Sequence, residues 1–246
     1  MHRFFIEKQH IEGKHARIFG EDVDHIAKVL RLKEGDELRL CDGACREWHA
    51  RIVSVDKKAV VAELLLSMEV DTEPDCRITL YQGIQKAGKF ETVVQKGVEL
   101  GVAAFVPFDC ERAVAKPWSG KDSRHSRYSR VAKEAAKQSR RGIVPTVEPP
   151  ISFDELCARS GQHELTLLLW EEEKERSLKD ALLAAPHAKH VAVIVGPEGG
   201  ISREEAQALQ KGGAVPVSLG SRVLRTETAG PAAAAMILYE KDDMAP

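Results

Sequence analysis

The sequence lacks several features that would assign a protein to a class at once. No apolar run reaches the roughly 18 residues that a membrane-spanning helix needs. The start of the chain, Met1–Glu7, has no apolar core of a secretion signal, so we expect a cytoplasmic protein. The five cysteines include no C-x-x-C pair. Zinc sites and disulfide frameworks therefore have no support, and we expect reduced thiols and no metal.

The chain also lacks a strong net charge. Its 36 Lys and Arg residues face 38 Asp and Glu residues, and the resulting net charge of −2 excludes a strongly basic nucleic-acid binder. The charge is unevenly distributed along the chain, because the segment from Cys110 to Pro145 holds ten basic and three acidic residues, a charge of +7. Such a block is either a solvated helix face or a surface that contacts a polyanion.

The pattern of apolar residues changes once along the chain. Residues 1–71 contain the strand-like runs Glu37–Cys41, His49–Val55 and Ala59–Leu66 and one helical stretch near Asp22–Leu30. The polar segment Val70–Asp75 marks a domain boundary. In residues 72–246, apolar strands alternate with amphipathic helices, which predicts a parallel sheet covered on both faces. The expected strands are Arg77–Gln82, Ala103–Pro107, Leu165–Trp170, His190–Gly196 and Ala214–Leu219. The expected helices are Lys89–Leu100, Arg127–Arg140, Ser152–Ala158, Ser177–Ala184 and Ser202–Gln210, with a last helix running into Tyr239.

Three of the expected strands end in segments that could bind a ligand. The strand from His190 ends in the glycine-rich turn Gly196–Gly200, and Ser202 with Glu205 forms a capping box that begins the next helix. The turn matches neither a dinucleotide fingerprint nor a Walker A loop, so it is either a plain tight turn or a ligand-binding turn of another kind. The strand from Leu165 ends at Trp170 and Glu171, which could line the same crevice.

The segment Val217–Ala229 carries the most unusual local chemistry. Arg222 and Arg225 precede the last helix, at the end where the helix dipole disfavours cations, and this local conflict indicates a functional role. We expect Thr228 to cap that helix, with Pro231 in its first turn, because proline is tolerated there.

The combination of these motifs resembles the RsmE family of 16S ribosomal RNA uridine N3-methyltransferases, in the SPOUT superfamily. The most specific matches are Gly196-Pro197-Glu198-Gly199-Gly200 and Leu224-Arg225-Thr226-Glu227-Thr228-Ala229. Further matches are Arg3-Phe4-Phe5 at the start and Gln95-Lys96 followed by Glu99-Leu100-Gly101.

The resemblance implies an α/β fold: a small N-terminal PUA-like β-barrel in residues 1–71 and a C-terminal SPOUT domain, a trefoil-knotted parallel sheet, in residues 72–246. It implies a homodimer that uses S-adenosylmethionine to methylate 16S ribosomal RNA, with the small ribosomal subunit as the expected substrate. The implied catalytic residues are Arg225 and Glu227. The implied cofactor-binding residues are Leu169, Trp170, Glu171, Gly196, Pro197, Glu198, Gly199, Gly200, Leu219, Gly220, Val223, Leu224, Thr228 and Ala229. The expected RNA-binding residues are Arg3, Arg31, Lys86, Lys89, Arg127, Arg130, Lys133, Lys137 and Arg141.

Three alternatives stay open from the sequence. The first is a SPOUT enzyme that methylates another atom, such as a ribose 2′-hydroxyl of transfer RNA. The second is an RNA-binding or ribosome-assembly factor without catalytic activity, which would bind RNA but no cofactor. The third is an α/β enzyme acting on a small molecule, which the +7 segment disfavours.

Overall fold

The computed structural model describes residues 1–86, 88–119 and 121–244, and the chain forms two compact units. The first unit contains Met1–Glu73 and, separately, Ala136–Val144; the second contains Pro74–Ala135 and Pro145–Pro246. The inclusion of Ala136–Val144 in the first unit differs from the single boundary expected after residue 71. No helix in the described part of the chain is long and apolar enough to cross a membrane.

The first unit is a six-stranded mixed sheet in the order β1-β4-β5-β6-β3-β2, in which only β1 and β4 run parallel. Its inward side chains, among them Phe4, Ile26 and Leu38, form one buried cluster. β5 shifts register twice along β6, and such bulges increase the twist of a sheet. The strands are β1 Arg3–Phe5, β2 Ile11–Glu12, β3 His15–Ile18, β4 Glu37–Cys41, β5 Arg46–Val55 and β6 Val60–Glu69. The helical segments are η1 Lys8–His10, α1 Glu21–Asp24 and the π-helical η2 His25–Val29.

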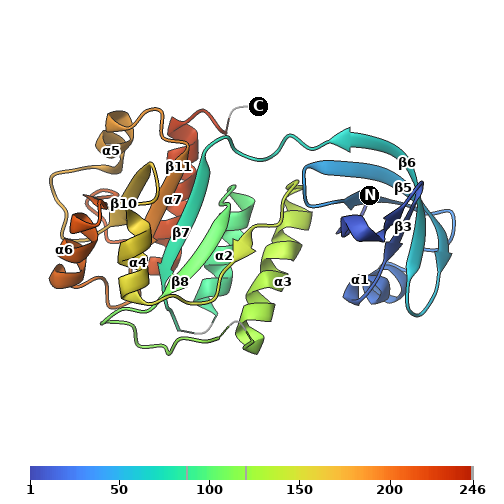
Figure 1. Cartoon of the computed structure of the whole chain (residues 1–246), viewed down its shortest axis with the longest axis horizontal. Helices are drawn as coiled ribbons and strands as arrows, with labels where there is room; N and C mark the ends of the chain where they lie inside the picture. Colours follow the sequence, from blue (N-terminus) through green and yellow to red (C-terminus); the bar gives the residue numbers. More distant parts are fainter. Residues whose placement is uncertain (87, 120, 245–246) are drawn as a thin grey trace. The chain divides into compact units, whose positions relative to one another are not determined.

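The second unit is a six-stranded sheet in the order β12-β10-β11-β7-β8-β9, with every neighbouring pair parallel (Figure 1). Its strands are β7 Arg77–Gly83, β8 Ala104–Phe108, β9 Thr146–Val147, β10 Leu165–Leu169, β11 His190–Val195 and β12 Val215–Val217. Its helices are α2 Lys89–Glu99, α4 Phe153–Ser160, α5 Leu178–Ala184, α6 Arg203–Lys211 and α7 Thr226–Glu240, while α3 Ser123–Gln138 belongs mainly to this unit.

Helices cover both faces of this sheet, as the alternation predicts. Tyr81 of β7 points into a cluster that includes Leu156 of α4 and Leu209 of α6. The preceding residue, Leu80, points to the other face, where its side chain lies against Gly230 of α7. All the strands and helices expected after residue 72 are present, whereas β9 and the short strands β1, β2 and β3 were not predicted. Because β12, β10 and β11 are neighbours, their carboxyl ends lie together at one edge of the sheet.

Candidate active site

A pocket of about 400 Å³ lies at the carboxyl ends of β10, β11 and β12, entirely within the second unit. Most of the predicted cofactor-binding residues line it: Leu169, Trp170, Glu171, Gly196, Pro197, Glu198, Gly200, Leu219, Gly220, Val223, Leu224 and Ala229. Both predicted catalytic residues, Arg225 and Glu227, line it too. The sheet order thus brings together three segments that are far apart in the sequence.

Two of the predicted cofactor-binding residues, Gly199 and Thr228, are not among the lining residues. Gly199 instead packs against Arg112, whose guanidinium donates to the Gly199 carbonyl at 3.4 Å. Several lining residues were not among the predicted cofactor-binding or catalytic residues: Lys89, Lys174, Val195, Val217, Ser218, Ser221, Arg222 and Thr226. Lys89 precedes the pocket loops by about 80 residues or more along the chain, so no local spacing could have indicated it.

The glycine-rich turn after β11 is held in place by close backbone packing. Its amide at Gly200 donates to the carbonyl of Pro197 at 3.0 Å, and the capping box of Ser202 and Glu205 begins α6 immediately afterwards, as predicted. At the end of β7, Gly83 lies directly against the backbone of Gly196 and Pro197, with no space for a side chain. The opposite wall carries Glu171, whose carboxylate lies over Gly200.

The segment between β12 and α7 offers unsatisfied backbone donors to the pocket. The amides of Ser221 through Arg225 donate to no carbonyl of the residues that the structure describes. Gly220 has a φ of 114°, a left-handed conformation that favours glycine, and nothing lies within 4 Å of where its Cβ would be. A bound molecule with polar edges could therefore approach this backbone closely and accept hydrogen bonds from it.

The last helix begins at Thr226, not after Thr228, so the predicted cap is wrong. The carbonyl of Arg225 already accepts the first helical bonds, from the amides of Thr228 and Ala229. The helix begins early because the Thr226 hydroxyl is fixed elsewhere: it donates to the Gly196 carbonyl at 2.5 Å and accepts from the amide groups of Gln82 and Gln85, each at 2.9 Å. Pro231 consequently lies inside the helix, beyond its first turn.

Lys89, expected to contact RNA, lies inside this site. Its ammonium is 3.2 Å from Glu198 Oε1 and 3.3 Å from Glu227 Oε2. The pKa of Lys89 is raised, chiefly by its hydrogen bond to Glu198. Burial opposes ionisation of Glu198, but hydrogen bonds from its own backbone amide, from Lys89 and from the Lys86 amide outweigh this and lower its pKa.

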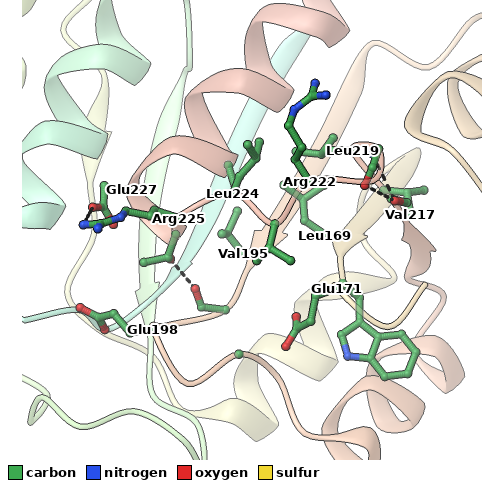
Figure 2. A pocket seen from close by; sticks show the side chains of 18 of the residues that line it. Leu169, Glu171, Val195, Glu198, Val217, Leu219, Arg222, Leu224, Arg225 and Glu227 are labelled. Atoms are coloured by element: carbon green, nitrogen blue, oxygen red, sulfur yellow. Dashed lines mark hydrogen bonds and ion pairs between the residues drawn. The ribbon is translucent and has the colours of Figure 1, made fainter. Parts of the chain in front are cut away.

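Arg225 stands at the mouth of the pocket beside Glu227 (Figure 2). Its Nη1 is 4.0 Å from Glu227 Oε1, and its side chain is 83% exposed, so most of its donors are open to a ligand. Arg222, by contrast, points away from this pair (Figure 2). No cluster of three or more metal-ligating side chains occurs among the described residues.

Three of the predicted RNA contacts are buried in the first unit, which corrects the prediction for them. Arg3 pairs with Glu47, Lys137 Nζ lies 2.7 Å from Asp22 Oδ1, and Arg141 pairs with Glu73. The expected basic helix ends at Gln138, and Arg140 takes a left-handed φ of 62°, so the chain leaves the helix before Arg141. These cations fix Ala136–Val144 to the first unit.

The other predicted RNA contacts reach the surface to different extents. Arg31, Lys86, Arg127 and Arg130 are exposed, and Lys133 is half-buried. Arg127 also pairs with Glu91 at 2.9 Å. Arg31 has a left-handed φ of 55°, which is uncommon for a residue with a side chain. The exposed cations remain the candidates for contact with a polyanion.

Comparisons with known proteins match these observations. Residues 72–238 match the family model of an RNA methyltransferase domain, and residues 20–65 match that of an RNA methyltransferase PUA domain. The chain is 34% identical to ribosomal RNA small subunit methyltransferase E of Bacillus subtilis, over 98% of each chain. It is 32% identical to the protein of that name from Aquifex aeolicus, over 93% of this chain and 95% of that one.

A solved structure is similar over nearly the whole length. It is ribosomal RNA small subunit methyltransferase E of Neisseria gonorrhoeae bound to S-adenosyl methionine, with 31% identity, a TM-score of 0.86 and 97% of each chain covered. Both the family and the two-part fold that the motifs suggested are therefore confirmed.

Proposed function

Since the chain belongs to the RNA methyltransferase family that includes the ribosomal RNA small subunit methyltransferases E, we propose that it methylates the N3 atom of a uridine in 16S ribosomal RNA, using S-adenosylmethionine. The observation that carries this proposal is the convergence of three strand ends on one pocket with Arg225 at its mouth. We further propose that the assembled small ribosomal subunit, in the cytoplasm, is the substrate.

The pocket suits S-adenosylmethionine in size and chemistry. Its volume of about 400 Å³ lies in the range of small-molecule sites. Leu169, Val195 and Leu224 supply apolar walls, and the amides from Ser221 onward supply donors for the polar edge of an adenine ring. Glu171 supplies acceptors for hydroxyl or ammonium groups. When bound, the cofactor supplies an electrophilic methyl group on a sulfonium.

The chain's own contribution to the reaction would come from Arg225 and Glu227. Uracil N3 carries a weakly acidic proton, and as that proton leaves, negative charge spreads to the two carbonyl oxygens. The Arg225 guanidinium can hold these oxygens and stabilise the charge. Glu227, next to Arg225, would either orient it or accept the N3 proton. Aligning N3 with the methyl group supplies the rest of the acceleration.

Capture of RNA would fall to the exposed cations Arg31, Lys86, Arg127 and Arg130, and to Lys133. Neutralising phosphates releases counterions, so the affinity for RNA should fall steeply with salt. We also propose a homodimer, which would cover the exposed apolar side chains of Met236 and Tyr239 on α7 and Leu183 on α5. Sedimentation analysis of the purified protein tests the dimer directly.

Nucleoside analysis of ribosomal RNA tests the reaction. A strain without the gene should lose one N3-methyluridine from 16S ribosomal RNA, and a plasmid copy of the gene should restore it. Arg225→Ala should fail to restore it, with methyl transfer lowered by at least about 100-fold while S-adenosylmethionine still binds. Loss of a ribose methylation instead, or normal turnover by the Arg225 variant, would contradict the proposal.

A further inference from the structure

Lys89 is the one predicted RNA contact that the structure places in the pocket. Its side chain is 31% exposed, and those of its two partners, Glu198 and Glu227, are 24% and 19% exposed. The three side chains come from three different elements: the first turn of α2, the glycine-rich turn after β11 and the first turn of α7. The ammonium of Lys89 therefore connects the cofactor side of the pocket to its catalytic side.

The position of this lysine is unfavourable for the helix that carries it. Lys89 is the first residue of α2, where the helix dipole disfavours a cation. The two carboxylates offset that cost, and without Lys89 they would face each other across the gap as like charges. Glu198 also accepts a hydrogen bond from the Lys86 amide at 3.3 Å, so it holds the backbone at Lys86 as well as the Lys89 side chain.

Glu227 presents its two oxygens to two different cations. Oε2 faces the half-buried ammonium of Lys89 at 3.3 Å, whereas Oε1 faces the exposed guanidinium of Arg225 at 4.0 Å. One cation is thus held by its surroundings and the other is free to meet a substrate. This is the arrangement of a carboxylate that orients Arg225.

We propose that Lys89 is a positioning residue of the methyl-transfer site: by holding Glu198 and Glu227 together, it fixes the carboxylate that orients Arg225 relative to the cofactor-binding turn. The inference rests on the proposed function, and it assigns Glu227 the orienting role. Lys89 acts through its two partners and is not a contact to RNA phosphate. Its removal should therefore lower kcat and leave the KM for RNA nearly unchanged.

The test compares Lys89→Met with Lys89→Arg and with a matched control. The control is Lys211→Met, which removes an exposed lysine from the last turn of α6 that does not line the pocket. Transfer of tritiated methyl groups from S-adenosylmethionine to small ribosomal subunits gives kcat and KM, calorimetry gives the affinity for S-adenosylmethionine, and thermal unfolding shows that each variant is folded.

Lys89→Met should lower kcat by roughly 10- to 100-fold, the scale of a catalytic group displaced by about 1 Å or of a lost supporting contact. Its KM for RNA and its affinity for S-adenosylmethionine should stay within about twofold, Lys89→Arg should recover most of kcat, and the control should match the wild type. If Lys89→Met does not fold, Glu198→Gln removes one half of the bridge and should lower kcat in the same direction.

Three results would overturn the assignment. A rise in KM for RNA at constant kcat would make Lys89 an RNA contact. An unchanged kcat would mean that Lys89 does not position the catalytic groups, and a raised kcat would mean that Glu227 works better without Lys89, as a proton acceptor would. An equal loss of kcat in Lys89→Met and Lys89→Arg would contradict the bridging role, because arginine keeps the positive charge between the two carboxylates. The identity of the methylated atom is read from the wild type alone, so a wild-type product other than N3-methyluridine overturns the proposed function and leaves the comparison among variants intact.

Discussion

Gly83 provides a direct test of whether the glycine-rich turn Gly196–Gly200, which we propose binds the cofactor, depends on its packing against β7. An ideal Cβ at this position would lie 2.5 Å from Pro197 Cδ and 2.9 Å from the carbonyl carbon of Gly196. Ordinary van der Waals contact begins at 3.4 Å, so the proline ring would have to retreat by about 0.9 Å in Gly83→Ala. The ring is bonded to the backbone nitrogen and cannot move aside alone, so the whole turn must shift.

The size of the effect follows from that displacement. Overpacking of this kind costs about 1 to 3 kcal/mol. If binding must push the turn back to its original position, that cost lowers the affinity for S-adenosylmethionine by roughly 5- to 150-fold. Calorimetric titration measures the affinity, and thermal unfolding measures the stability. The control is Gly213→Ala, which imposes an unfavourable backbone conformation at φ 97° but meets only a distant atom at 3.9 Å, outside the pocket.

The two variants should differ in their affinity for S-adenosylmethionine. Gly213→Ala should lower stability by about 1 kcal/mol and leave the affinity for S-adenosylmethionine unchanged. Gly83→Ala should weaken the affinity. A Gly83→Ala protein that binds S-adenosylmethionine as tightly as the wild type would refute the reasoning, because the turn could then absorb the side chain without moving the ligand-binding groups.

Three further predictions concern polar groups. Thr226→Val removes the hydroxyl that joins Gln82, Gln85 and the Gly196 carbonyl, and should destabilise the fold by about 1 to 3 kcal/mol in thermal unfolding; Thr226→Ser should retain most of the stability. Lys137→Met removes a buried ammonium beside Asp22 and should cost about 3 to 5 kcal/mol of stability without changing the salt dependence of RNA binding. Replacing the exposed Arg130 in Arg130→Met should reduce the slope of RNA affinity against salt concentration by about 1; a change of that slope in the Lys137 variant would contradict the assignment. The pKa of Glu198 lies below the usual 4.5, so the unfolded chain binds the proton more tightly. Its contribution to stability is therefore full above about pH 5 and is lost as pH falls through the lowered pKa, and Glu198→Gln should flatten the dependence of stability on pH in that acidic range alone.

The motifs indicated the pocket because they lie at strand ends. Three apolar runs followed by Trp170-Glu171, Gly196–Gly200 and Leu219-Gly220 could be recognised from local pattern, since a parallel sheet places such ends at one edge. The capping box of Ser202 and Glu205 correctly predicted the start of α6, because its two partners are only three residues apart in the sequence. Predictions of this kind succeed because the interactions are local.

The failed predictions share a different physical cause. Thr228 had every local property of a cap, but a long-range hydrogen bond from Thr226 to Gly196 sets where α7 begins. Lys137 and Arg141 have the spacing of an exposed basic face, yet carboxylates of the first unit, Asp22 and Glu73, bury them.

The sequence by itself determined the class of fold, the order of strands and helices after residue 72, the family and the loops that form the pocket. These depend on hydrophobic period, turn chemistry and motifs, all of which act over short distances along the chain. Only the tertiary structure decided which cations are available to RNA and which carboxylates meet Lys89. Ion pairs between residues more than 100 positions apart leave no local pattern, because they depend on sheet order and on the burial that the folded chain creates.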